Sequence, residues 1–164
     1  MSKKSLSELN VVLALPNQQV AQGISNSLRS EGIKRIAYAS TSSEALNAMA
    51  SSGGRVNMFF LASNLEPHGG IDFTRFVRMT NSPMARADII LHLDGEVTKE
   101  RALEARNAGA SALMIGDITG AVVLKQMEQV ISVQKKFITS DSYTGPDRRR
   151  LNPPPYTGQE KRQS

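Results

Sequence analysis

The chain has 164 residues, and its 20 lysines and arginines outnumber its 15 aspartates and glutamates to give a net charge of +5. It contains no cysteine and only two histidines, His68 and His92, which excludes disulfides, cysteine nucleophiles and thiolate metal centres. The charge surplus is too small for a dedicated nucleic-acid binder, and no apolar run reaches the roughly 18 residues that span a bilayer. Because residues 1–8 also lack the apolar core of a secretory signal, we expect a cytoplasmic protein with no metal, no cofactor and no membrane insertion.

Short apolar runs alternate with helical patterns from residue 9 to residue 136. Most of the runs are rich in branched or aromatic residues and are bounded by turn residues, which predicts strands. The stretches between them repeat apolar residues at helical spacing, and Thr41 with Glu44 three residues later is typical of a capping box. In chain order, the predicted strands and helices are Leu9–Leu15, Gln18–Ser30, Arg35–Ala39, Ser42–Ala50, Val56–Ala62, Ile71–Met79, Asp88–Leu93, Lys99–Ala108, Ala112–Ile115 and 119–136.

Regular alternation of strand and helix predicts an α/β fold, a doubly wound parallel sheet of five strands flanked by five helices. This domain covers residues 9–136 and follows an N-terminal extension of residues 1–8. In such sheets a functional site lies outside the carboxyl ends of the strands. The segments to inspect are therefore Leu15–Asn17, Ala62–Asn64, Leu93–Gly95 and Gly116–Asp117.

Several polar residues have a plain structural interpretation. Asp94 precedes Gly95 in a turn dipeptide, and Asp117 precedes a predicted helix, where a carboxylate is favourable. His68 lies in a loop containing proline and glycine and His92 in an apolar run, with no acid or nucleophile next to either in the sequence. We interpret both histidines as structural or solvated rather than ligating.

Composition changes at residue 137. Residues 137–164 hold four of the seven prolines, five basic and three acidic residues and a polar majority, which predicts a flexible tail. The sequence Tyr-Thr-Gly-Pro-Asp-Arg-Arg at 143–149 is followed at 156–162 by the similar Tyr-Thr-Gly-Gln-Glu-Lys-Arg. Arginine can fork onto phosphates or carboxylates and tyrosine can stack on a base, so the tail either recognises a ligand or is merely solvated. The candidate binding residues are Tyr143, Arg148, Arg149, Arg150, Tyr156 and Arg162.

Residues 9–136 resemble the receiver domain of two-component response regulators, of the chemotaxis-regulator type. The most telling segment is Ala105–Ser111, with the sequence ARNAGAS, and Asn64–Phe73 and Thr41–Ala45 also fit. The resemblance implies a flavodoxin-like sheet with strand order 2-1-3-4-5. The tail is similar to tails on some proteobacterial single-domain receivers.

The resemblance also implies a phosphorylation site, and its polar groups are missing here. A working receiver has an aspartate at the end of the third strand, two Mg²⁺-binding acids after the first, a hydroxyl ending the fourth and a lysine ending the fifth. Counting eight residues back from Gly70 places Ala62 at the phosphoacceptor position, and a slip of one residue places Ser63 there. The corresponding degenerate pocket consists of Leu15, Pro16, Ala62, Leu93 and Gly116.

The resemblance therefore implies a pseudo-receiver, a non-enzymatic signalling adaptor that is not phosphorylated on aspartate and acts by protein–protein contact. Receivers commonly bind partners through the fourth helix, fifth strand and fifth helix, which here carry Lys99, Arg101, Arg106 and Lys125. The expected partner is a signalling protein such as a kinase or a chemotaxis component, or a second copy of the chain. The alternative is an effector that binds cyclic di-GMP through its arginine-rich tail.

Overall fold

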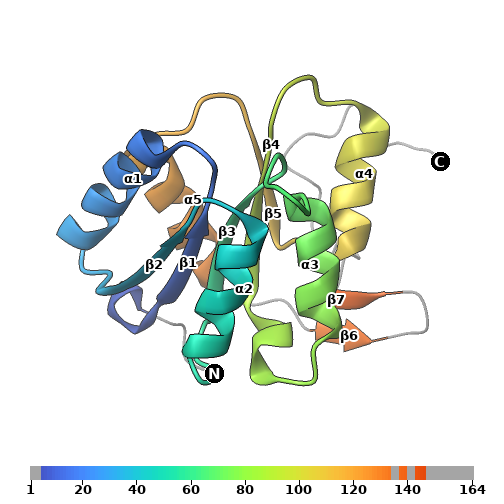
Figure 1. Ribbon diagram of the computed structural model, residues 1–164, viewed down its shortest axis with the longest axis horizontal. Coiled ribbons are helices and arrows are strands. Elements are labelled where there is room, and N and C mark those ends of the chain that lie inside the picture. Colours follow the sequence, from blue (N-terminus) through green and yellow to red (C-terminus); the bar gives the residue numbers. More distant parts are fainter. Residues whose placement is uncertain (1–4, 134–136, 140–142, 147–164) are drawn as a thin grey trace.

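The computed structural model describes residues 5–133, 137–139 and 143–146 (Figure 1). Five strands and five helices alternate along its main part, and two 3-10 turns and a strand pair are added to them. In chain order the elements are η1 Leu6–Glu8, β1 Asn10–Ala14, α1 Gln18–Ser30, β2 Arg35–Ala39, α2 Ser42–Ser51, β3 Met58–Ala62, α3 Gly70–Met79, η2 Pro83–Arg86, β4 Asp88–Leu93, α4 Lys99–Ala108, β5 Ala112–Ile115, α5 Gly120–Ser132, β6 Phe137–Thr139 and β7 Thr144–Pro146.

The first five strands form one parallel sheet in the order β2-β1-β3-β4-β5. Helices α1 and α5 contact each other on one face of the sheet, while α2, α3 and α4 cover the other face (Figure 1). The predicted α/β class, the doubly wound sheet and the strand order are confirmed. No helix in the described part of the chain is both long and apolar enough to cross a bilayer.

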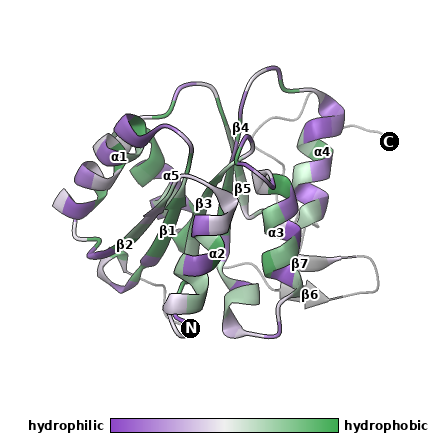
Figure 2. Cartoon of the chain, in the orientation of Figure 1, coloured by the Kyte–Doolittle hydropathy of each residue, from purple (hydrophilic) through white to green (hydrophobic). Residues whose placement is uncertain are grey.

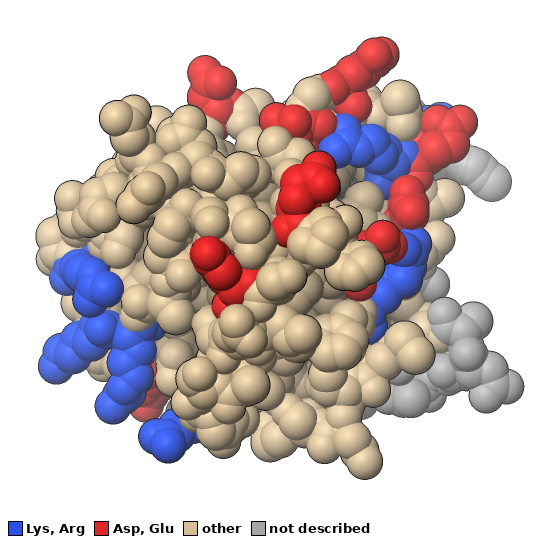
Figure 3. Space-filling model, viewed as in Figure 1, with Lys and Arg blue, Asp and Glu red and all other residues tan. Residues whose placement is uncertain are grey.

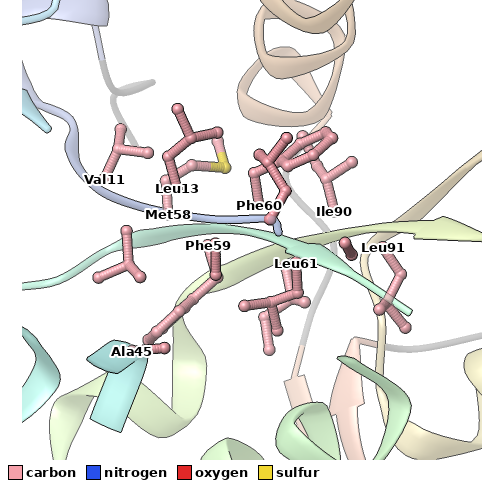
Figure 4. Packing of buried hydrophobic residues seen from close by; sticks show 14 of the residues in the cluster. Val11, Leu13, Ala45, Met58, Phe59, Phe60, Leu61, Ile90 and Leu91 are labelled. Atoms are coloured by element: carbon pink, nitrogen blue, oxygen red, sulfur yellow. The ribbon is translucent and has the colours of Figure 1, made fainter. Parts of the chain in front are cut away.

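The centre of the sheet is buried on both faces. Every residue of β3 is buried, and Phe60 and Ile90 point to one side of the sheet while Phe59 and Leu61 point to the other, toward Ala45 of α2 (Figure 4). Side chains alternate across a strand, so a strand covered on both faces needs an almost continuous apolar sequence. Figure 2 shows the result, with hydrophobic strands inside and, outside them, helices that carry both hydrophobic and hydrophilic residues.

Helix starts are fixed by side chains that follow the strands. Asn17, Thr98 and Thr119 each accept a hydrogen bond from a backbone N–H in the first turn of their helix, which satisfies one of its unpaired donors. Thr41 does the same for Glu44, as predicted. These caps hold the loops at the carboxyl edge of the sheet in fixed conformations.

The predicted capping box at α2 is shifted by one residue. The Glu44 carboxylate accepts from the backbone N–H and the hydroxyl of Ser40, at 2.7 and 3.0 Å, rather than from Thr41. These two hydrogen bonds favour the charged form and lower the pKa of Glu44 below its ordinary value. The loop between β2 and α2 is therefore closed by an ionised side chain.

The described part of the predicted tail has regular structure. Strands β6 and β7 pair antiparallel, and β7 contacts α3. Tyr143 is 7% exposed, and its hydroxyl donates to the carbonyl of Pro146 at 2.7 Å. For these residues the structure shows paired strands in a stretch that the sequence predicts to be a flexible tail. The five other candidate residues of the tail, Arg148, Arg149, Arg150, Tyr156 and Arg162, lie outside the described residues.

Candidate functional site

The carboxyl ends of the parallel strands bring the predicted pocket positions to one edge of the sheet. Ala62 ends β3 and pairs in register with His92 of β4, and Leu93 pairs with Ile115 of β5, directly before Gly116. Leu15 follows β1, and its N–H donates to the carbonyl of Ala39 at the end of β2, at 3.0 Å.

The pocket positions present mainly aliphatic side chains. Leu15 and Ala62 are each 3% exposed, and Leu93 is 1% exposed. Among the residues that the structure describes, no group of three or more histidine, cysteine, aspartate or glutamate side chains is placed to hold a metal ion. The polar contacts at this edge come instead from Ser63, Arg101 and His92.

Ser63 and Arg101 join the end of β3 to the loop before α4. The Ser63 hydroxyl accepts from the Asp94 N–H at 2.9 Å and from Arg101 Nη2 at 2.8 Å. The other terminal nitrogen of Arg101 donates to the carbonyls of Asp94 and Glu96, at 2.6 and 2.8 Å. One guanidinium therefore ties three points of two loops together. These contacts occupy the lone pairs of the Ser63 oxygen and make it unsuited to nucleophilic attack.

His92 makes the corresponding link to the loop after β5. Its Nε2 lies 2.7 Å from the carbonyl oxygen of Gly116, so Nε2 carries the proton and donates. Its ring stacks on Phe60, with centroids 6.4 Å apart and an angle of 18° between the planes. The side chain is thus held on two sides and acts as a structural tie between β4 and β5.

A cavity of about 410 Å³ opens at this edge between the ends of β4 and β5. Asp94 and Asp117 line it, together with Val20 of α1 and the backbone of Gly95 and Gly116, and its described lining includes no lysine or arginine. Two carboxylates without a cation repel a phosphoryl group. Each aspartate also adjoins a glycine with positive φ, 73° at Gly95 and 89° at Gly116, in agreement with the turn role expected for Asp94.

The candidate residues for binding a partner or a ligand do not lie together in the structure. Arg106 is exposed on α4, whereas Arg101, expected on the same partner surface, is engaged with the loops at the edge of the sheet. Tyr143 is buried in the strand pair beside α3 and does not lie at the sheet edge, and its burial argues against the expected contact with a ligand.

The contacts of Arg101 predict a measurable effect on the loop that it holds. Arg101→Ala removes the charged donor from Ser63, Asp94 and Glu96, and we expect amide hydrogen exchange in residues 94–98 to become about tenfold faster, a loss of ~1.4 kcal/mol of local stability. Exchange mass spectrometry measures this change. Arg106→Ala on the exposed side of the same helix is the control and should leave these amides unchanged; equal exchange in both variants would contradict the bridging role.

No family model and no curated protein matches the sequence. Solved structures do match in their fold. The chemotaxis regulator CheY4 of Vibrio cholerae superposes with a TM-score of 0.65 at 21% identity, over 74% of this chain and 98% of that one. The chain has the fold of a receiver domain. The receiver domain of the response regulator NarL from Mycobacterium tuberculosis gives 0.66 at 16% identity over 77% and 98% of the two chains, and a CheY-like receiver from Methanospirillum hungatei gives 0.65 at 15% over 76% and 94%.

The sequence resemblance leads us to expect a phosphoacceptor position at the end of β3. Ala62 is the last residue of that strand and Ser63 is the next, with its N–H bonded to the carbonyl of His92 at 2.8 Å. Neither of these two residues carries a carboxylate. The receiver fold is present, and its carboxyl edge is held by Ser63, Arg101 and His92.

Proposed function

We propose that this chain is an atypical receiver that signals by protein–protein contact and is not phosphorylated on aspartate. The observation that carries the proposal is the carboxyl edge of the sheet, where Leu15, Ala62 and Leu93 are almost fully buried. Phosphoryl transfer to a receiver needs an acidic acceptor and oxygen ligands for a hard cation that neutralises the phosphoryl oxygens. Aliphatic side chains at the end of β1 and β3 supply neither.

The links made by Arg101 support a single displayed conformation. In a switching protein, the loop before α4 must adopt two arrangements of similar free energy. Here that loop is bound to β3 through Ser63, and the bound guanidinium belongs to α4 itself. These links support a mechanism in which helix α4 is displayed in one position relative to the sheet.

The partner surface in this proposal is formed by α4, β5 and α5. Each element exposes one large apolar side chain, with Leu103 54%, Ile115 62% and Val122 46% exposed. The charged side chains of Arg106 and Lys125 are exposed on the same helices. Glu100, Glu104 and Glu128 are exposed on these helices too, so the apolar residues lie among charges of both signs. Such a surface suits a signalling protein that presents an apolar patch among complementary charges.

Beryllofluoride tests the proposal directly, because it mimics a phosphoryl group on aspartate in the presence of Mg²⁺. We expect the amide NMR spectrum of this protein to stay unchanged when beryllofluoride and Mg²⁺ are added. The Thermotoga maritima receiver DrrB, solved in a BeF3-activated form, is the positive control. Specific shifts at Leu15, Ala62 and Ser63 would refute the absence of an acceptor site.

The second candidate is an effector of cyclic di-GMP, and the repeated Tyr-Thr-Gly motif with its arginines favours it. Guanidinium groups bind phosphates through paired hydrogen bonds. Calorimetry with cyclic di-GMP on the full chain and on the triple variant Arg148→Ala, Arg149→Ala, Arg150→Ala distinguishes the two functions. Binding that the variant loses would establish the effector, and no binding to the full chain would discard it.

A further inference from the structure

An apolar groove runs between α2 and α3, on the face of the sheet opposite α1 and α5, and the loop that follows β3 forms part of its lining. It has a volume of about 440 Å³, and Leu46, Pro67, Phe73 and Phe76 contribute its apolar lining. Leu46 and Phe76 are each 45% exposed, and Met79, one turn further along α3, is 81% exposed. Large apolar side chains gathered at a groove mark a binding surface.

The groove is preformed by hydrogen bonds between its two walls. The Ser42 N–H at the start of α2 donates to the Glu66 carbonyl at 2.9 Å, and the Ser42 hydroxyl accepts from the His68 N–H at 3.0 Å. Ser42 is 3% exposed, so this link is shielded from water. Binding in the groove therefore requires little rearrangement of the loop between β3 and α3.

The rim of the groove is acidic. Figure 3 shows acidic groups over the centre of this face, while basic groups gather toward its edges. Asp72 lines the groove and pairs with Arg75 at 2.8 Å, whereas Glu66 makes no ion pair within the described ranges. Glu44, in the first turn of α2 but outside the lining of the groove, carries a further exposed carboxylate that is bound to Ser40. This rim suits an occupant that carries positive charge beside apolar groups.

The chain itself supplies a segment of that chemistry close by. Strand β7 contacts α3 and ends at Pro146, and residues 147–164 follow it. They contain five basic and two acidic residues around the sequence Pro-Pro-Pro-Tyr at 153–156. An extended chain spans ~3.3 Å per residue, whereas the whole of α3, ten residues long, measures about 15 Å. The segment is long enough to reach any part of the groove.

We propose that residues 147–164 of the same chain dock in the groove between α2 and α3. The three prolines and Tyr156 pack against Phe73 and Phe76, because proline-rich segments in the polyproline II conformation bind aromatic-lined grooves. The arginines at 148–150 lie against the carboxylates of the rim. Tethering to β7 gives the segment an effective concentration of order mM, which favours this occupant over a segment from another molecule.

The absence of cysteine from the chain allows a sharp test, because one introduced cysteine is a unique labelling site. A nitroxide spin label on Thr157→Cys, next to Tyr156, broadens the amide NMR signals of residues near it. We expect selective loss of signal at residues 42–46 and 73–76, independent of protein concentration. Broadening confined to other surfaces, or none at all, would overturn the proposal.

Two further samples show whether the contact depends on the groove and whether it forms within one chain. Phe76→Gln in the labelled chain should restore the signals of residues 42–46, whereas Leu103→Gln, an equally exposed position on α4, should not; restoration by both or by neither overturns the proposal. Unlabelled isotope-enriched chain mixed with spin-labelled chain should show no broadening. Broadening in the mixture would assign the groove to the tail of a second copy and overturn the docking within one chain.

Discussion

Replacing Arg78 by methionine is expected to lower the free energy of unfolding by about 3 kcal/mol. The side chain is 3% exposed, and its guanidinium donates to the carbonyls of Gly109, Ala85 and Ala87 at 2.9, 2.8 and 2.6 Å. It also reaches the Ser111 hydroxyl at 3.4 Å. Methionine fills part of the volume but leaves two buried carbonyl oxygens and one partly buried one without this donor, and each carries a desolvation cost.

The guanidinium of Arg78 stays charged although it is buried. Desolvation lowers the pKa of Arg78 to about 10, while Asp88 and Tyr143 act in the opposite direction. Because this pKa still lies well above 7, the guanidinium is protonated near neutral pH and forms charge-assisted hydrogen bonds. It thereby joins α3 to the turns before β4 and before β5.

Denaturant unfolding followed by circular dichroism measures the effect, with Arg75→Met as the matched control. Arg75 lies on the same helix with its side chain 42% exposed, and its two ion pairs are with exposed carboxylates. Such surface pairs contribute 0–1 kcal/mol, so the control should lose no more than ~1 kcal/mol. Similar losses in the two variants would show that burial does not set the contribution of Arg78.

The parts of this fold that could be predicted from the sequence are the strands and helices, because the burial of their residues follows a regular pattern along the chain. The sheet is covered on both faces, so β3 and β4 had to be almost wholly apolar and stood out as strands. The expected pocket positions met at one edge because parallel strands end there. The cap at Thr41 was readable as well, since Glu44, whose N–H it accepts from, lies only three positions away.

Sequence patterns could not reveal contacts that join distant residues. Arg101 and Ser63 are 38 positions apart, and Arg78 and Gly109 are 31 apart. The sequence pattern of α4 is that of a solvated helix face. Nothing in it distinguishes Arg101, which binds the two loops, from the exposed Arg106. The strand pair beside Tyr143 was missed as well, because β7 also lies against α3, which is more than 60 positions away in the sequence.

The second large effect on stability is expected from Gly70→Ala, at the close contact between the start of α3 and the end of β3. A Cβ atom on Gly70 would lie 2.5 Å from the carbonyl oxygen of Ala62 and 2.8 Å from Cδ2 of Leu91. Both are nearer than real Cβ contacts allow, and the first neighbour is backbone. Helix α3 would have to move away from β3, at a cost of about 2–3 kcal/mol.

The movement should also reach the carboxyl edge of the sheet. Gly70 donates to the carbonyl of Ser63 at 3.4 Å, so displacing the start of α3 disturbs the residue that Arg101 binds. We therefore expect Gly70→Ala to combine a lower unfolding free energy with faster hydrogen exchange in residues 94–98. A loss of stability without faster exchange would show that a displacement of α3 is not transmitted to the loop before α4.

The same substitution in α1 provides a control of opposite sign. No described atom beyond its own helix lies within 4 Å of a Cβ built on Gly23, which is in the middle of that helix. Alanine is favoured over glycine inside a helix by up to ~1 kcal/mol, because glycine loses more backbone entropy on folding. Gly23→Ala should therefore stabilise the protein in the same unfolding experiment. If both variants change stability in the same direction, then close packing at Gly70 does not determine the outcome.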